Sequence, residues 1–104
     1  MRAATVAKCL LLKVTRPYSH LHDALLREVL LSQPALVAIV GVECDVWEEA
    51  LDMMGVQMDA RGGREPVSCN TSAHPDETLQ QAAAFAQQWC TLQGWTPELH
   101  VLEI

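Results

Sequence analysis

Aromatic side chains and positive charges are scarce in this sequence. It contains one Phe, one Tyr and three Trp, so a hydrophobic core must come mainly from Leu, Val, Ala and Met. Seven Lys and Arg stand against thirteen Asp and Glu, which gives a formal net charge of -6. Because an acidic surface repels phosphate groups and no basic run offsets it, we expect the protein to bind neither nucleic acid nor an anionic membrane.

Long apolar runs and export signals are also missing. The longest strongly apolar stretch, residues 35–42, is far shorter than the ~20 residues that cross a bilayer. The apolar run near the N-terminus is too short for the core of a signal peptide, and no cleavage motif follows it. We therefore expect a cytoplasmic protein whose four cysteines form no disulfides.

The apolar pattern predicts four strands. The clearest is residues 35–42, whose unbroken apolar run is typical of a strand that is buried on both faces. Residues 4–14 predict a first strand and residues 66–70 a third. Residues 99–104 alternate apolar and polar side chains, which predicts a last strand at an edge of the sheet.

Three amphipathic segments separate these strands and predict helices. The first starts after Ser19, the second starts at Asp45 and ends at Gly55, and the third starts at Pro75 and ends at Gly94. The order β-α-β-α-β-α-β predicts a small three-layer α/β/α domain with a mainly parallel four-stranded sheet. A single domain then spans residues 1–104. The pattern leaves the order of the strands open.

Cysteine and histidine gather at the predicted carboxyl edge of this sheet, where open α/β sheets bind ligands. Cys44 and Asp45 follow the second strand, Cys69 ends the third, and His74 comes shortly after it. One interpretation is a zinc site formed by Cys44, Cys69 and His74. Another is a thiol site in which Cys44 at a helix start is the nucleophile, His74 the base and Asp45 a further catalytic residue. A third is that these side chains only cap helices and solvate turns.

Two of the five arginines flank a pair of glycines. Arg61 and Arg64 enclose Gly62 and Gly63, and such a pair of guanidinium groups suits a phosphate or carboxylate ligand. The spacing is not that of a phosphate-binding P-loop. An ordinary surface turn is the alternative interpretation, and it would lie at the opposite edge of the sheet from the cysteine and histidine cluster.

The helices carry more apolar side chains than one buried face requires. Leu31 on the first helix and Phe85 and Leu92 on the third are examples. Such a surplus is typical of a surface that is buried against another subunit or another protein. No familiar catalytic or nucleotide-binding motif occurs beside it. We therefore expect a non-catalytic protein-interaction or self-associating module, with a homodimer as one form. The alternative is a small metal- or thiol-dependent enzyme, or a metal-binding protein, with its site at the carboxyl edge.

Two short motifs resemble a known family. They are Cys44-x-x-Trp47-Glu48-Glu49-x-x-Asp52, and Thr71-x-x-His74-x-x-Glu77-x-Leu79 followed by Phe85-Ala86. In both, the chain resembles a family of short uncharacterised bacterial proteins. Ala73 stands where that family has Trp. The resemblance covers roughly the second half of the chain and implies a bacterial origin and an α/β fold. It implies no activity.

Overall fold

Two apolar strands form the centre of a parallel sheet in the computed structural model, which describes residues 5–60 and 69–104. They are β1 (Val6–Val14) and β2 (Leu36–Gly41), which pair in register so that Leu10 lies opposite Val37. Nearly every residue of β2 is buried. The unbroken apolar run of β2 is therefore explained by helices that cover both faces of the sheet.

The two more polar strands form the edges. β3 (Asn70–Ala73) pairs with β2, β4 (Thr96–Glu103) pairs with β1, and all four strands are parallel in the order β3-β2-β1-β4. The alternating burial of β4 confirms the prediction that the last strand is an edge strand. Its exposed face carries Glu98 and His100, and charged residues on an edge discourage pairing with another sheet.

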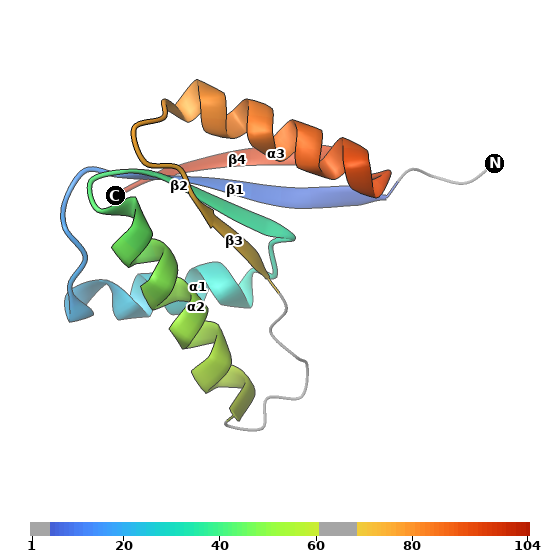
Figure 1. The fold of residues 1–104 in the computed structure, drawn as a ribbon. Coiled ribbons are helices and arrows are strands. Elements are labelled where there is room, and N and C mark those ends of the chain that lie inside the picture. The colour runs from blue at the N-terminus through green and yellow to red at the C-terminus, as the bar shows by residue number, and fades with distance from the viewer. Residues whose placement is uncertain (1–4, 61–68) are drawn as a thin grey trace.

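The helices divide between the two faces of the sheet (Figure 1). A short 3-10 turn η1 (His20–His22) leads into α1 (Asp23–Leu31), and α1 and α2 (Cys44–Ala60) lie on one face. α3 (Leu79–Gln93) lies on the other. Right-handed crossovers require this division, because the chain moves one way from β1 to β3 and then back across the sheet to β4. The predicted three-layer α/β/α architecture is confirmed.

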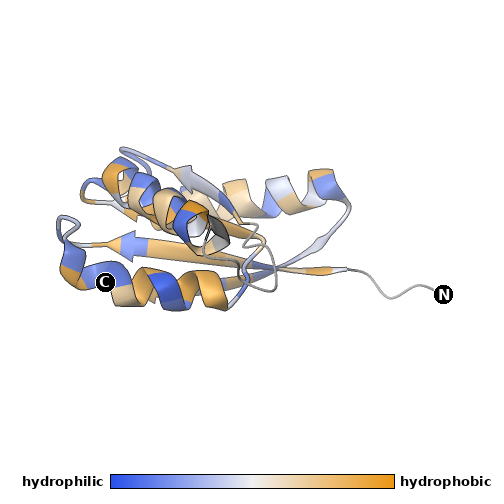
Figure 2. Ribbon diagram, turned by 90° about the horizontal axis from the view of Figure 1, so that it is seen from below, coloured by the Kyte–Doolittle hydropathy of each residue, from blue (hydrophilic) through white to orange (hydrophobic). Residues whose placement is uncertain are grey.

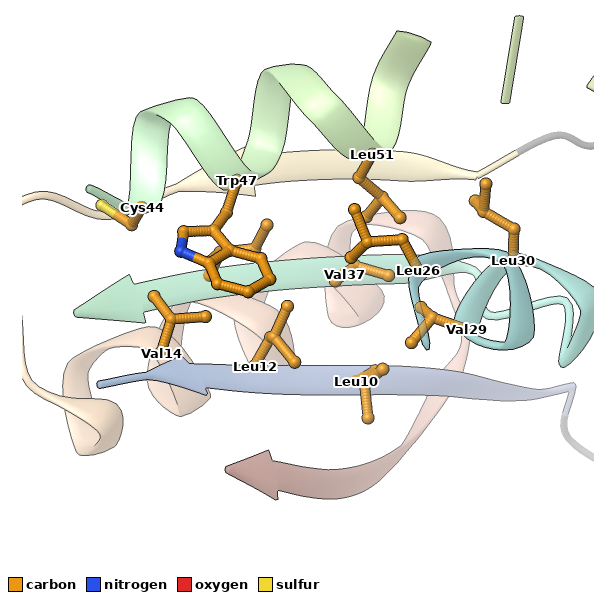
Figure 3. Packing of buried hydrophobic residues seen from close by; sticks show 11 residues of the cluster. Leu10, Leu12, Val14, Leu26, Val29, Leu30, Val37, Cys44, Trp47 and Leu51 are labelled. Carbon is orange, nitrogen blue, oxygen red and sulfur yellow. The ribbon is translucent and has the colours of Figure 1, made fainter. Parts of the chain in front are cut away.

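Two hydrophobic cores fill the spaces between these layers. In the larger core, side chains from β1, β2, α1 and α2 point toward one another around Trp47, which is fully buried (Figure 3). The smaller core lies under α3 and contains Cys9 of β1 and Cys90 of α3. Apolar and polar residues alternate along the helices, as expected when one side packs on the sheet and the other faces solvent (Figure 2).

Four predicted boundaries are wrong, and one of them is the start of β4, which lies at Thr96 and not at residue 99. α2 does not end at Gly55 but continues to Ala60, because Gly55 is buried in the helix and packs beside Leu30 of α1. α3 does not begin at Pro75. It begins at Leu79, because Thr78 caps it by accepting a hydrogen bond from the Gln81 amide, and the Gln81 side chain bonds back to the Thr78 amide. The third strand is residues 70–73 and not residues 66–70.

Within residues 5–60 and 69–104, no helix is long and apolar enough to cross a membrane. The predicted anion site of Arg61 and Arg64 lies outside the described residues.

Candidate functional site

The structure separates the three residues that were predicted to bind zinc. Cys44 and His74 follow β2 and β3 and so lie at the carboxyl edge, as expected. Cys69 precedes β3, which places it at the amino edge. Because the strand starts four residues later than predicted, the structure does not bring Cys44, Cys69 and His74 together. In the described ranges, no group of three or more His, Cys, Asp or Glu side chains is arranged to hold a metal ion.

The thiol site predicted from Cys44, Asp45 and His74 is not assembled either. The Cys44 side chain is buried in the core beside Trp47, on the face of the sheet that α1 and α2 cover. The His74 ring packs edge-on against Phe85 of α3 on the opposite face, with the ring centres 4.7 Å apart. Asp45 is an exposed residue in the first turn of α2. The sheet therefore lies between the proposed nucleophile and the proposed base.

His74 is instead bonded to two residues that the sequence analysis did not assign to it. Its Nε2 atom lies 2.8 Å from the Ser72 hydroxyl oxygen, and its Nδ1 atom lies 2.8 Å from Glu77 Oε2. A carboxylate can only accept, so in the neutral imidazole Nδ1 carries the ring hydrogen and Nε2 accepts from the Ser72 hydroxyl. We call this chain of hydrogen bonds the Ser72–His74–Glu77 relay.

Local backbone geometry positions the relay. Thr71 donates a 2.7 Å hydrogen bond to Glu48 of α2, so Thr71 faces α2. Since side chains alternate along an extended chain, Ser72 and His74 face α3. The His74 amide donates to the Ile39 carbonyl of β2, and the Glu77 amide donates to the His74 carbonyl, which closes the turn. This turn brings the Glu77 carboxylate back to the imidazole.

A second feature of the same edge is an open hollow of about 320 Å³ between the start of α1 and the side of α2. We call it the α1–α2 hollow. One wall carries Tyr18, His20 and Asp23, and the other carries Val46, Glu49, Ala50, Met53, Met54 and Gln57 of α2. The spacing of the α2 residues is that of one helical face. A volume of this size lies at the lower end of the range for ligand pockets.

A polar network fixes one wall of the α1–α2 hollow. The Tyr18 hydroxyl donates a short hydrogen bond to Asp23, whose other oxygen lies 3.6 Å from His20 Nδ1. The hydrogen bond to Asp23, and then burial, raise the pKa of Tyr18. The Tyr18 ring packs edge-on against Trp47, and the Trp47 indole donates to the Arg16 carbonyl at 3.0 Å. The wall is thus anchored to the core.

The other wall combines acidic and apolar side chains. Residues 44–60 contain no Lys or Arg. Their first nine residues include Asp45, Glu48, Glu49 and Asp52. Two apolar residues that line the hollow, Val46 and Met53, are nevertheless 39% and 52% exposed. An exposed apolar strip beside carboxylates is typical of a surface that contacts another molecule.

The sequence contains signals for both features. Ser72 and His74 are two residues apart, which places them on one face of a strand, and His74 and Glu77 are three apart across a turn. The face of α2 that lines the hollow follows helical spacing, but its exposure depends on where α1 begins. No family model, curated protein or solved structure matches the chain.

Proposed function

We propose that the protein acts as a protein-interaction module whose α1–α2 hollow docks a basic, amphipathic segment of a partner protein. The observation that carries the proposal is the exposed apolar strip of α2 beside the carboxylates of Asp23 and Glu49. Among the described residues that line the hollow there is no Lys or Arg. A ligand therefore meets apolar surface and negative charge together.

The apolar strip would supply most of the binding free energy. Val46, Met53 and Met54 lie in the hollow, and burying one such side chain contributes roughly 1.5–3 kcal/mol. Methionine is unbranched and adapts its shape to the surface that covers it. A helix whose apolar residues recur every three to four positions fits an apolar strip on another helix.

The negative charge of the hollow favours a basic partner over an acidic one. The chain has a formal net charge of -6, and the carboxylates that line the hollow are those of Asp23 and Glu49. Lys and Arg beside the apolar residues of a partner would meet Asp23 and Glu49, which speeds association and fixes orientation. An acidic partner would be repelled.

The same charge disfavours a second copy of this chain as the occupant. A symmetric dimer through the hollow would bring α2 of one copy against α2 of the other, because a twofold interface pairs a surface with itself. The carboxylates of Asp23 and Glu49, which line the hollow, would then face the same carboxylates of the other copy. A different protein fits this surface better than the homodimer that the sequence suggested.

Two sequence predictions belong to the proposal. The four cysteines are free. Free thiols are usual in a reducing compartment, so they support a cytoplasmic location. A bacterial origin rests on the resemblance of the two short motifs. The earlier alternative of an enzyme built on Cys44 loses support, because the sheet lies between Cys44 and His74.

Calorimetric titration with designed peptides tests the proposal. The probe is a Leu/Lys peptide of about 18 residues, which spans about five helical turns and has one apolar face. A peptide of the same composition, scrambled to lose that face, and a Leu/Glu peptide serve as controls. We expect binding of the amphipathic basic peptide alone.

Two matched variants locate the binding. Met53→Lys places a positive charge in the hollow, and Leu92→Lys places one on α3, where Leu92 is 77% exposed. We expect Met53→Lys to weaken the affinity about tenfold, equal to about 1.4 kcal/mol, and Leu92→Lys to leave it unchanged. Equal affinity for the scrambled peptide, or an equal loss in both variants, would contradict the proposal. If the wild-type protein forms a dimer without peptide, and Met53→Lys dissociates that dimer, the result would favour self-association through the hollow.

A further inference from the structure

The Ser72–His74–Glu77 relay lies on the face of the sheet opposite the α1–α2 hollow, and the binding proposal does not use it. The Ser72 hydroxyl is hydrogen-bonded to the His74 imidazole, and the imidazole is hydrogen-bonded to the Glu77 carboxylate. Both hydrogen bonds are 2.8 Å long. A hydroxyl that donates to an imidazole, which in turn donates to a carboxylate, is the arrangement that activates a serine as a nucleophile.

The environment of each member suits that role. His74 is only 6% exposed, and Phe85 packs against its ring, so the orientation of the imidazole is fixed. Ser72 is half-buried, so the residue that would react is not enclosed in the core. The turn is already closed by the backbone bonds of His74 and Glu77, so the two side-chain bonds are additional to those that shape it.

We propose that Ser72 is a catalytic nucleophile that the His74 base activates and that acts on uncharged carboxylic esters. The Ser72 oxygen forms a bond to the ester carbonyl carbon while its proton passes to His74 Nε2. The carbon–oxygen bond to the leaving group then breaks, and the leaving oxygen takes that proton. Water repeats the two steps on the acyl-serine, releasing the acid and restoring Ser72. Glu77 is a positioning residue that holds the Nδ1 hydrogen.

The chemistry of the surroundings narrows the substrate class. The chain has a formal net charge of -6, which disfavours anionic substrates such as phosphate esters. An ester also releases an oxygen leaving group without the nitrogen protonation that an amide requires. Neutral esters with a good leaving group are therefore the substrates that the relay would cleave most readily.

The test uses the full-length protein and p-nitrophenyl acetate. Release of p-nitrophenolate is followed by absorbance, and the acetylated residue is identified by peptide mapping with mass spectrometry. We expect acetylation at Ser72, which Ser72→Ala abolishes. The matched control is Ser32→Ala, which removes an exposed serine whose hydroxyl donates to the Val29 carbonyl. That variant should retain the full rate.

Variants of the other two members separate a catalytic role from a structural one. We expect His74→Gln to slow acetylation of Ser72 by about a hundredfold, the usual contribution of a general base. Glu77 is exposed, so Glu77→Gln should fold normally and still slow the reaction, and Glu77→Asp should restore part of the rate. Circular dichroism checks the fold of each variant. The proposal is overturned if Ser72 is not acetylated, if Ser72→Ala reacts like the wild type, or if Glu77→Gln is as fast as the wild type.

Discussion

The four cysteines differ in what surrounds their thiols. Cys9 and Cys90 are fully buried between β1 and α3, with their sulfur atoms 3.2 Å apart. Burial, followed by the contact with Cys90, raises the pKa of Cys9 to about 12. Burial also raises the pKa of the half-buried Cys69 thiol to about 11. The thiolate is the reactive form, so neither residue is a ready nucleophile at neutral pH.

Alkylation by iodoacetamide at pH 8 checks these thiols. Because a raised pKa keeps the thiol protonated until the pH approaches that value, native Cys69 should react roughly a hundredfold more slowly than Cys69 in urea. Native Cys9 should react more slowly still. Mass spectrometry of the alkylated peptides gives both rates. Equal rates for Cys69 in native and unfolded protein would contradict the burial that we describe.

Single residues were predicted well where burial alone decides their role. Helical spacing predicts that Trp47 lies on the core face of its helix, and the predicted core elements include Cys9 and Cys90, where free Cys behaves as a small apolar residue. All three are buried. Cys69 was predicted at the wrong edge because β3 is short and its residues Asn, Thr, Ser and Ala have no apolar pattern. Pairing with β2 makes this segment a strand, and the sequence of the segment alone does not show that pairing. That error produced the zinc site and hid the relation of Ser72 to His74.

The ends of the elements depend on close backbone contacts that periodicity does not reveal. Gly41 ends β2 with a φ of 109°, and a Cβ atom built there would lie 2.0 Å from the Val14 carbonyl oxygen of β1. Gly55 lies inside α2, and the nearest atom to its built Cβ is Leu30 Cδ1 at 4.0 Å. Gly41 is therefore required, because a side chain there would clash with β1, whereas Gly55 leaves room for a Cβ atom.

Replacing these two glycines by alanine should change stability in opposite directions. Gly41→Ala forces the strand end away from β1 and should lower the free energy of unfolding by about 3 kcal/mol or more. Gly55→Ala adds a favourable helix residue without a clash and should raise it by up to about 1 kcal/mol. Urea denaturation measures both, and each variant is the control for the other. A Gly41→Ala protein as stable as the wild type would refute the close approach of β2 to β1.

At the scale of the whole molecule, the alternation of strands and helices predicted the layers but not the order of the strands. Long apolar runs place β1 and β2 in the centre, and the polar β3 and alternating β4 suit the edges. Which edge each strand takes follows from the crossover of α3 to the opposite face, which no local pattern records. The α1–α2 hollow likewise exists only once two helices are placed beside each other.

Charge is also unevenly placed over the molecule. All seven Lys and Arg fall within residues 1–64, and residues 65–104 contain none. Within residues 44–60, on the wall of the α1–α2 hollow, basic residues are missing as well. Near the hollow, a basic partner would be attracted to the carboxylates of Asp23 and Glu49, which lie beside the apolar strip.

The measurement that tests the central claim most directly is an amide chemical-shift map of the protein titrated with the Leu/Lys amphipathic peptide. We predict that the amides of Tyr18, Asp23, Val46 and Met53 shift with peptide concentration, because they surround the α1–α2 hollow. The amide chemical shifts of Phe85 and Leu92 on α3 should not change. Shifts that gather on α3, spread evenly over the molecule or fail to occur would contradict the claim that the α1–α2 hollow is the binding surface.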